Sequence, residues 1–169
     1  MPKGQLMPKI SAGLLVHRAQ PDGQREVLLV HPGGPFWAKK DDGAWSIPKG
    51  EVDPPVVTVA SADLVATADR EFAEELGQPA PAGDRVALGE VVQAGGKRVV
   101  AWAVEGDLDP TAGQSNRFEM EWPPRSGRVE SFPEVDRAEW FTAADARRKL
   151  VTAQAELVDR LLVIVDRPS

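Results

Sequence analysis

The sequence predicts a single domain in which β-strands and α-helices are mixed, and three observations support this fold class. The chain has 169 residues, the length of one compact domain. Hydrophobic residues form 42% of it and charged residues 27%, a composition typical of proteins with a buried core. Short apolar runs typical of strands alternate with segments in which apolar residues recur at helical spacing. We therefore expect one α/β (α+β) domain over residues 10–169, and a flexible tail over 1–9, which lacks an apolar period.

The first part of this domain predicts a hairpin, a long loop and a short strand. Residues 10–17 and 26–31 are apolar runs separated by the turn-rich sequence Gln20-Pro21-Asp22-Gly23. A loop over residues 32–43 follows, and then a short strand over 44–47 that stops at Pro48. Because loops of this length in small domains are usually functional, we expect the 32–43 loop to lie near a binding site.

The later elements follow from the same patterns. Residues 61–76 predict a helix that stops at Gly77, because apolar side chains recur there every three or four residues. Strands are expected over 86–92, 97–104, 118–122 and 138–141, with a turn at Gly95-Gly96 and a polar loop over 105–117. Thr142 and Asp145 form a capping signature for a helix that runs to Leu150, and a last amphipathic helix is expected over 157–165.

Composition excludes several classes of function. The net charge is -6, and the chain has no block of Lys and Arg, so we expect no nucleic-acid polymer as a partner. With no Cys and only two His, any metal must be held by oxygen ligands. The longest aliphatic run, residues 161–165, is too short to span a bilayer, and the N-terminus lacks a signal pattern. We expect a cytoplasmic protein without a membrane partner, and the sequence carries no signal for the oligomeric state.

Three glutamates in the predicted helix form its most informative feature. Glu71, Glu74 and Glu75 fall within an arc of about 100° beside the apolar stripe. Carboxylates this close repel one another, which a hard divalent cation such as Mg²⁺ would relieve by binding to their oxygens. A solvated acidic helix face is the alternative interpretation.

The surrounding motif favours the cation site. The sequence Trp45-Ser46-Ile47-Pro48-Lys49-Gly50-Glu51 leads toward the helix segment Arg70-Glu71-Phe72-Ala73-Glu74-Glu75-Leu76-Gly77. Together they resemble the Nudix hydrolase family, whose box is G-x5-E-x7-R-E-U-x-E-E-x-G-U with U apolar. Gly50 matches the first glycine, Phe72 matches U, and Glu139-Trp140-Phe141 resembles the family's closing strand. The resemblance covers residues 10–150 and implies a Nudix-type sandwich, in which a mixed curved sheet lies between α-helices.

The chain departs from this box at three positions. Arg70 follows Gly50 by twenty residues, six more than in the family pattern. Ala62 stands where the family has its first Glu, and Gln78 replaces the final apolar residue. In the family that Glu mainly supports the site, so we expect a less well organised site rather than loss of the metal.

The resemblance implies a role for each matching residue. Glu74 and Glu75 would be the principal ligands of Mg²⁺, for which Mn²⁺ could substitute, and Glu71 would be a third ligand or the base that activates water. Arg70 would hold a Glu by charge-assisted hydrogen bonds, and Arg70, Glu71 and Glu74 form the expected catalytic set. The backbone carbonyl of Lys49 would complete the metal shell. Some family members take the base from a later loop, for which the candidates here are Glu119, Glu121 and Glu134.

The implied reaction is water attack on phosphorus in a nucleoside diphosphate linked to another group, so we expect the partner to be a phosphorylated small molecule, and specifically a nucleotide. The Pro-Lys-Gly-Glu variant is similar to the branch that hydrolyses dinucleoside polyphosphates and diphosphoinositol polyphosphates. Expected substrate-binding residues are Lys49, Gly50, Lys39, Lys40, Trp45 and Trp37. The open alternatives are a nucleotide-binding sensor without turnover, a pyrophosphatase that sanitises nucleoside triphosphates or oxidised nucleotides, and a plain structural domain.

Overall fold

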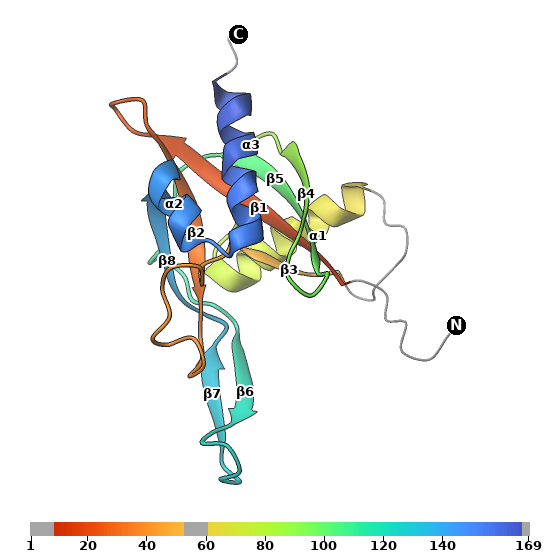
Figure 1. Cartoon of the computed structure of the whole chain (residues 1–169), viewed down its shortest axis with the longest axis vertical. Coiled ribbons are helices and arrows are strands. Elements are labelled where there is room, and N and C mark those ends of the chain that lie inside the picture. Colours follow the sequence, from red (N-terminus) through yellow and green to blue (C-terminus); the bar gives the residue numbers. More distant parts are fainter. Residues whose placement is uncertain (1–8, 53–60, 167–169) are drawn as a thin grey trace, which may run out of the picture.

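A mixed β-sheet forms the centre of the molecule in the computed structural model, which describes residues 9–52 and 61–166 (Figure 1). The strands are β1 (Ile10–Ala19), β2 (Arg25–Pro32), β3 (Lys49–Glu51), β4 (Val86–Val92), β5 (Arg98–Glu105), β6 (Arg117–Glu121), β7 (Val129–Pro133) and β8 (Val135–Thr142). The helices are α1 (Ser61–Leu76), α2 (Ala143–Lys149) and α3 (Ala155–Val165), with a 3-10 turn at Thr152–Gln154 before α3. Most of the tail expected over 1–9 lies outside the described residues.

The main sheet has the strand order β4-β5-β1-β2-β8, with β3 paired to β1 beside this path. Strands β1 and β5 run parallel, and the other pairs are antiparallel, so the sheet is mixed as predicted. The far end of β1 pairs with β2, as the predicted hairpin requires, whereas residues 11–13 pair with β3. This pairing fixes the Lys49–Glu51 segment at the start of β1. Strands β6 and β7 form a separate hairpin that extends below the body of the molecule in Figure 1.

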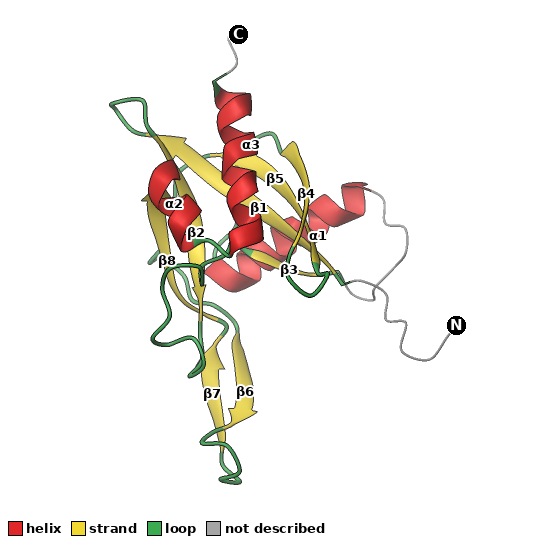
Figure 2. Cartoon of the chain, in the orientation of Figure 1, coloured by secondary structure: helices red, strands yellow, loops and turns green. Residues whose placement is uncertain are grey.

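Helices cover both faces of this sheet, with α1 on one face and α2 and α3 on the other (Figure 2). Because side chains alternate along a strand, β1 contributes Leu14 and Val16 to the α1 face and Leu15 to the opposite face, all fully buried. The sandwich predicted from the family resemblance is therefore confirmed. Within the ranges described above, none of the three helices is long and apolar enough to cross a membrane.

The predicted strand over 44–47 is wrong in its position. These residues form only isolated bridges, Val30 with Ser46 and Trp45 with Leu150, and the regular strand β3 begins after Pro48. The physical reason is that the backbone of Trp45 bonds to the end of α2 and the residues after it: its N–H donates to the Lys149 carbonyl at 3.0 Å, and its carbonyl accepts from the Val151 N–H at 2.8 Å. Strand β7 was not predicted either, whereas the capping prediction is confirmed, since Thr142 Oγ1 accepts from the Asp145 N–H at 3.2 Å.

Candidate active site on helix α1

Helix α1 presents its carboxylates next to its buried stripe. Ala68, Phe72 and Leu76 pack into the sheet and are at most 2% exposed. Glu71, Glu74 and Glu75 lie at the edge of this stripe and are all partly buried. The helix ends at Gly77, whose φ of +67° is a conformation that favours glycine, as the sequence predicts. The side chains of Ser61 and Ala62 and the whole of residues 53–60 lie outside the described residues, so the structure does not test the lengthened box.

Strand β3 lies directly against these carboxylates. The Lys49 N–H donates to Glu75 Oε1 at 3.0 Å. A Cβ at position 50 would overlap the carboxylate of Glu71, so glycine leaves the space that this side chain occupies. Two separated parts of the sequence, the Pro-Lys-Gly segment and the glutamate helix, therefore meet at one place. The role of the Lys49 carbonyl as a metal ligand stays a prediction.

The surroundings of Glu71 and Glu75 disfavour the ionised form of both side chains. Burial raises the pKa of Glu75 to about 8, against the Lys49 N–H and ammonium, and the charges of Glu71 and Glu134 raise it further. Burial and the charge of Glu74 also raise the pKa of Glu71. Arg70 opposes this second shift, because its Nη2 lies 3.7 Å from Glu71 Oε1. A cation bound beside these carboxylates would stabilise their ionised forms and so oppose both shifts.

Lys49 supplies a cation at the same place. Burial and the nearby charge of Lys97 lower the pKa of the Lys49 ammonium to about 8, against the attraction of Glu75. A lysine with such a pKa stays mostly protonated at neutral pH and would be stabilised further by an approaching phosphate. The site therefore combines acidic groups for a cation with a basic group suited to an anionic substrate.

The donor set fits a hard divalent cation in its chemistry, since it offers carboxylate oxygens and no sulfur. Within residues 9–52 and 61–166, however, no group of three or more His, Asp or Glu side chains converges tightly enough to hold a metal as it stands. Binding would thus need the Glu side chains to turn toward a common point, which their flexible χ angles allow.

Glu134 is the late-loop candidate that the structure places beside this group, because its charge acts on both Glu71 and Glu75. Two backbone bonds position it: the Asn116 N–H donates to the Glu74 carbonyl at 3.1 Å, and the Glu134 N–H donates to the Asn116 carbonyl at 2.8 Å. Glu119 and Glu121 instead lie exposed on β6, in the projecting hairpin.

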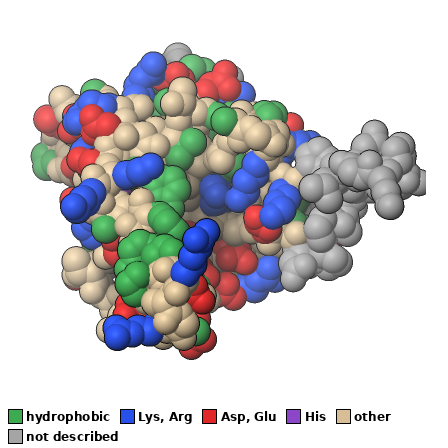
Figure 3. Space-filling model, turned by 60° about the horizontal axis from the view of Figure 1, so that its bottom comes forward, with side chains coloured by type: hydrophobic (Ala, Val, Ile, Leu, Met, Phe, Trp, Pro, Cys, Tyr) green, Lys and Arg blue, Asp and Glu red, His purple; other side chains and the backbone are tan. Residues whose placement is uncertain are grey.

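A cleft of about 540 Å³ begins at Glu75 and extends between the end of α1, the 110–117 segment and β8. It is lined by Glu75, Leu76, Pro110, Thr111, Gly113, Gln114, Ser115, Arg117, Pro133, Val135, Asp136, Arg137, Ala138 and Glu139. In the view that brings the bottom of the molecule forward, acidic and basic side chains gather beside a band of hydrophobic ones (Figure 3). The cleft offers room for a substrate next to the carboxylates.

Several predicted substrate-binding residues lie elsewhere. Trp37, Lys39 and Lys40 are exposed on the loop after β2, and none of them lines the cleft as described. Trp45 contradicts its prediction, because only 1% of it is exposed and its ring packs edge-on against His31 and Phe141 in the core. A buried indole cannot stack on a substrate base.

Sequence reasoning missed most of the cleft wall, including Gln114, Ser115, Arg117 and Arg137. Gln114 and Ser115 lie in a polar loop, Arg117 begins strand β6 and Arg137 lies on β8, and neither periodicity nor a motif distinguishes them. Only the tertiary fold brings them next to Glu75.

Comparison with known proteins gives the class of this protein. Residues 7–161 match the model of the Nudix domain, and the chain therefore belongs to the Nudix family. Membership of this family supports a hydrolase that acts on phosphoanhydride bonds. No curated protein matches the chain at a significant level.

Solved structures resemble this chain over most of its length. The binary complex of an Ap4A hydrolase from C. elegans has 20% identity and a TM-score of 0.60, covering 92% of this chain and 97% of that one. The NUDIX domain of Shewanella oneidensis NrtR, complexed with ADP ribose, has 18% identity and a TM-score of 0.61, covering 98% and 93%. A MutT protein from Methanosarcina mazei has 18% identity and a TM-score of 0.56, covering 96% and 99%. These likenesses show a shared fold.

Proposed function

We propose that the protein is a divalent-metal-dependent pyrophosphohydrolase that cleaves a phosphoanhydride bond in a nucleoside diphosphate linked to a second group. The observation that carries this proposal is the contact between β3 and α1, in which the Lys49 N–H bonds to Glu75 while Gly50 makes room for Glu71. Dinucleoside polyphosphates are the leading substrate class. The Pro-Lys-Gly-Glu sequence and the likeness to an Ap4A hydrolase across nearly the whole of both chains support this choice.

Glu74 and Glu75 would hold the cation, together with Glu71 and the Lys49 carbonyl. Mg²⁺ suits these oxygen donors, and Mn²⁺ is the expected substitute. When bound, such an ion neutralises phosphate charge and lowers the pKa of a coordinated water. The raised pKa of Glu75, about 8, implies that binding would release a proton below that pH.

The remaining roles belong to other side chains of this chain. Glu134 would accept the proton of the attacking water, and its charge acting on Glu71 and Glu75 supports this choice among the late-loop carboxylates. The Lys49 ammonium would contact a substrate phosphate. Arg70, 3.7 Å from Glu71, would restrain that carboxylate. The cleft beyond Glu75 would take the group attached to the diphosphate.

A hydrolysis screen with and without Mg²⁺ or Mn²⁺ tests the proposal, using dinucleoside polyphosphates, nucleotide sugars and nucleoside triphosphates. We expect metal-dependent turnover of a dinucleoside polyphosphate, and its loss in Glu74→Gln. Glu134→Gln should slow the reaction strongly, whereas the matched variant Glu119→Gln, on the exposed hairpin, should not. Retention of full activity in Glu74→Gln would contradict the proposal. Preferential turnover of nucleoside triphosphates would instead favour a sanitising pyrophosphatase.

Nucleotide binding without turnover is the second candidate. Ala62 in place of the family's first Glu favours it, as do the glutamates that do not converge on one point. Calorimetric binding of a dinucleoside polyphosphate in the presence of Mg²⁺, with no product formed, would support this function. Turnover at enzyme-like rates would exclude it.

A further inference from the structure

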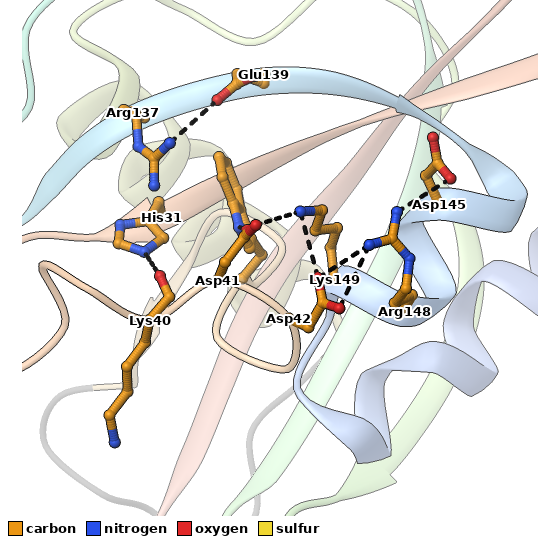
Figure 4. Close-up of polar contacts among 10 residues, drawn as sticks. His31, Lys40, Asp41, Asp42, Arg137, Glu139, Asp145, Arg148 and Lys149 are labelled. Carbon is orange, nitrogen blue, oxygen red and sulfur yellow. Dashed lines mark hydrogen bonds and ion pairs between the residues drawn. The ribbon is translucent and has the colours of Figure 1, made fainter.

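His31 is a buried residue that the reaction outlined above does not use. It lies at the end of β2, is 0% exposed, and has a hydrogen-bond partner on each ring nitrogen. Nδ1 lies 2.8 Å from Asp136 Oδ1, and Nε2 lies 2.7 Å from the Lys40 carbonyl oxygen, the second contact being drawn in Figure 4. The Lys40 carbonyl is an acceptor, so Nε2 donates to it, while Nδ1 faces the Asp136 carboxylate.

The bond between His31 and Asp136 lies at a point where strand pairing between β2 and β8 is interrupted. The β2–β8 ladder shifts register between His31 and Pro32, which pair with Arg137 and Val135, so Asp136 is the extra residue of a bulge. The ladder does not fix a bulged residue, whereas a side-chain bond to a fully buried ring does. Asp136 lines the cleft and follows Glu134 by two residues.

Glu134 is also held from this side of the molecule. Its carbonyl accepts from the Gly33 N–H at 2.9 Å, two residues beyond His31. The start of the loop after β2 and the ring of His31 thus bind the chain on both sides of position 135. Together they set the backbone of the segment that carries Glu134 toward Glu71 and Glu75.

The end of the same loop is fastened independently of His31. Asp41 accepts from Trp45 Nε1 at 2.8 Å and from Lys149 Nζ at 2.5 Å, and Asp42 pairs with Arg148 at 3.1 Å (Figure 4). The bond from His31 to Lys40 therefore adds to an attachment that already exists. The bond to Asp136 has no such substitute among the described contacts of that side chain, apart from a 3.8 Å ion pair with Arg137.

We propose that His31 is a positioning residue for hydrolysis: through Asp136 it fixes the β8 bulge, and so holds Glu134 beside the carboxylates of α1. The inference rests on the proposed function, because it assigns His31 a part in placing the proposed base.

Three substitutions at His31 separate its two bonds. His31→Asn keeps an amide N–H near the place of Nδ1, His31→Gln keeps one near the place of Nε2, and His31→Phe keeps the ring without either donor. We expect kcat to fall about tenfold or more in His31→Phe and His31→Gln with KM little changed, the usual size of an effect from a supporting residue. His31→Asn should keep kcat within about threefold of wild type, because it preserves the bond to Asp136.

Phe141→Leu is the matched control. The ring of Phe141 packs against the same Trp45 ring that His31 contacts, with the Phe141 and Trp45 ring centroids 4.8 Å apart. The Phe141 side chain has no group that can hydrogen-bond to Asp136. It should lower the melting temperature and leave kcat unchanged. A purely structural role for His31 would make all four variants less stable with unchanged kcat, which would overturn the proposal, as would equal loss of kcat in His31→Asn and His31→Gln.

Amide hydrogen exchange separates this inference from the proposed function, because it needs no substrate. In His31→Phe the amides of Gly33 and Glu134 should exchange faster than in wild type, while Leu29 in the middle of β2 keeps its protection. If wild type hydrolyses nothing, the proposed function fails, and faster exchange at Glu134 would still support positioning by His31. Unchanged exchange at both amides would overturn it whether or not the protein is active.

Discussion

The two faces of the central sheet differ in the kinds of side chain that are buried against them. On the face covered by α2 and α3, fifteen of the described residues form one apolar cluster, among them Trp45, Leu157 and Leu161. On the α1 face the apolar cluster has ten residues, and Glu71 and Glu75 lie beside it at the edge of the helix. One face thus gathers apolar area without charge, while the other accepts half-buried carboxylates with raised pKa values.

This difference indicates that one face mainly stabilises the fold, while the other holds the charged groups of the candidate site. Burying apolar area stabilises the fold by roughly 25 cal/mol per Å², whereas burying ionised carboxylates costs free energy unless a partner neutralises them. The α1 face therefore gives up stability to hold charge next to Lys49 and the cleft, and the opposite face compensates. Substitutions on the two faces should separate activity from stability in opposite directions.

Glu75→Gln should show the largest effect, on the α1 face. We expect hydrolysis to fall by about 10²–10³-fold, as when one preorganised charge-stabilising group is lost. The folded-state pKa of Glu75 is raised to about 8, so protonated Glu75 favours the folded state and ionised Glu75 disfavours it. The contribution of this group to the free energy of unfolding is fully present below pH 4.5 and is lost as pH rises through about 8. In EDTA at pH 9, urea unfolding should therefore show the variant to be more stable than wild type, with no difference at pH 4.

A lower stability of Glu75→Gln at pH 9 would contradict this account of the α1 face. It would mean that the bond from the Lys49 N–H outweighs the cost of burying the charge. Glu130→Gln, on the exposed strand β7, is the matched control and should change neither property.

Leu157→Ala should have the next largest effect, on the opposite face. Leu157 is fully buried in α3, and truncation of such a residue costs about 2–5 kcal/mol of unfolding free energy through lost contacts and a cavity. At temperatures where the variant is folded, kcat should be unchanged. Val163→Ala, 59% exposed on the same helix, should cost less than about 0.5 kcal/mol. A fall in kcat of folded Leu157→Ala would show that the two faces are not separable.

The contrast between the faces also explains what could be predicted from the sequence. Phe72 and Glu75 lie on one helix, so their faces follow from a period of 3.6 residues, and both are where the pattern indicates. Strand β3 has only three residues, Lys-Gly-Glu, without apolar alternation, and it exists because β1 offers it a free edge. Trp45 is next to a loop in sequence, but long-range packing against Phe141 buries it. Local patterns carry no information about such partners.

The cleft shows the same limit. Glu134, Glu119 and Glu121 are equivalent in sequence, and tertiary contacts distinguish the first of them, among them its backbone bonds with Asn116 and Gly33. The motif predicts that Lys49 lies beside the glutamates of α1, as its bond to Glu75 shows, whereas Arg117 and Arg137 reach the cleft wall through the path of the chain.

Substitution of His17 should have the smallest effect on stability. It tests the comparison of the two faces directly, because His17 is a titratable group on the face covered by α2 and α3. It is 6% exposed and lines a cavity of about 360 Å³ with Leu161 and Ile164. Burial lowers its pKa, and the charge of Arg25, with Nη1 3.4 Å from Nδ1, lowers it further, against the charge of Glu105. The folded state therefore keeps this ring neutral at a pH where the unfolded chain already binds a proton.

The pH dependence of stability due to His17 has the opposite sign to that due to Glu75. Stability from neutral His17 is fully present above the unfolded pKa of about 6.5 and is lost as pH falls toward the lower folded value. The slope from this one group cannot exceed about 1.4 kcal/mol per pH unit. In urea titrations from pH 7.5 to 5, His17→Gln should lose less unfolding free energy than wild type, and the two should differ by a constant above pH 7. Parallel curves over the whole range would show that the α3 face tolerates a buried charge, and the contrast with the α1 face would then rest on cation binding alone.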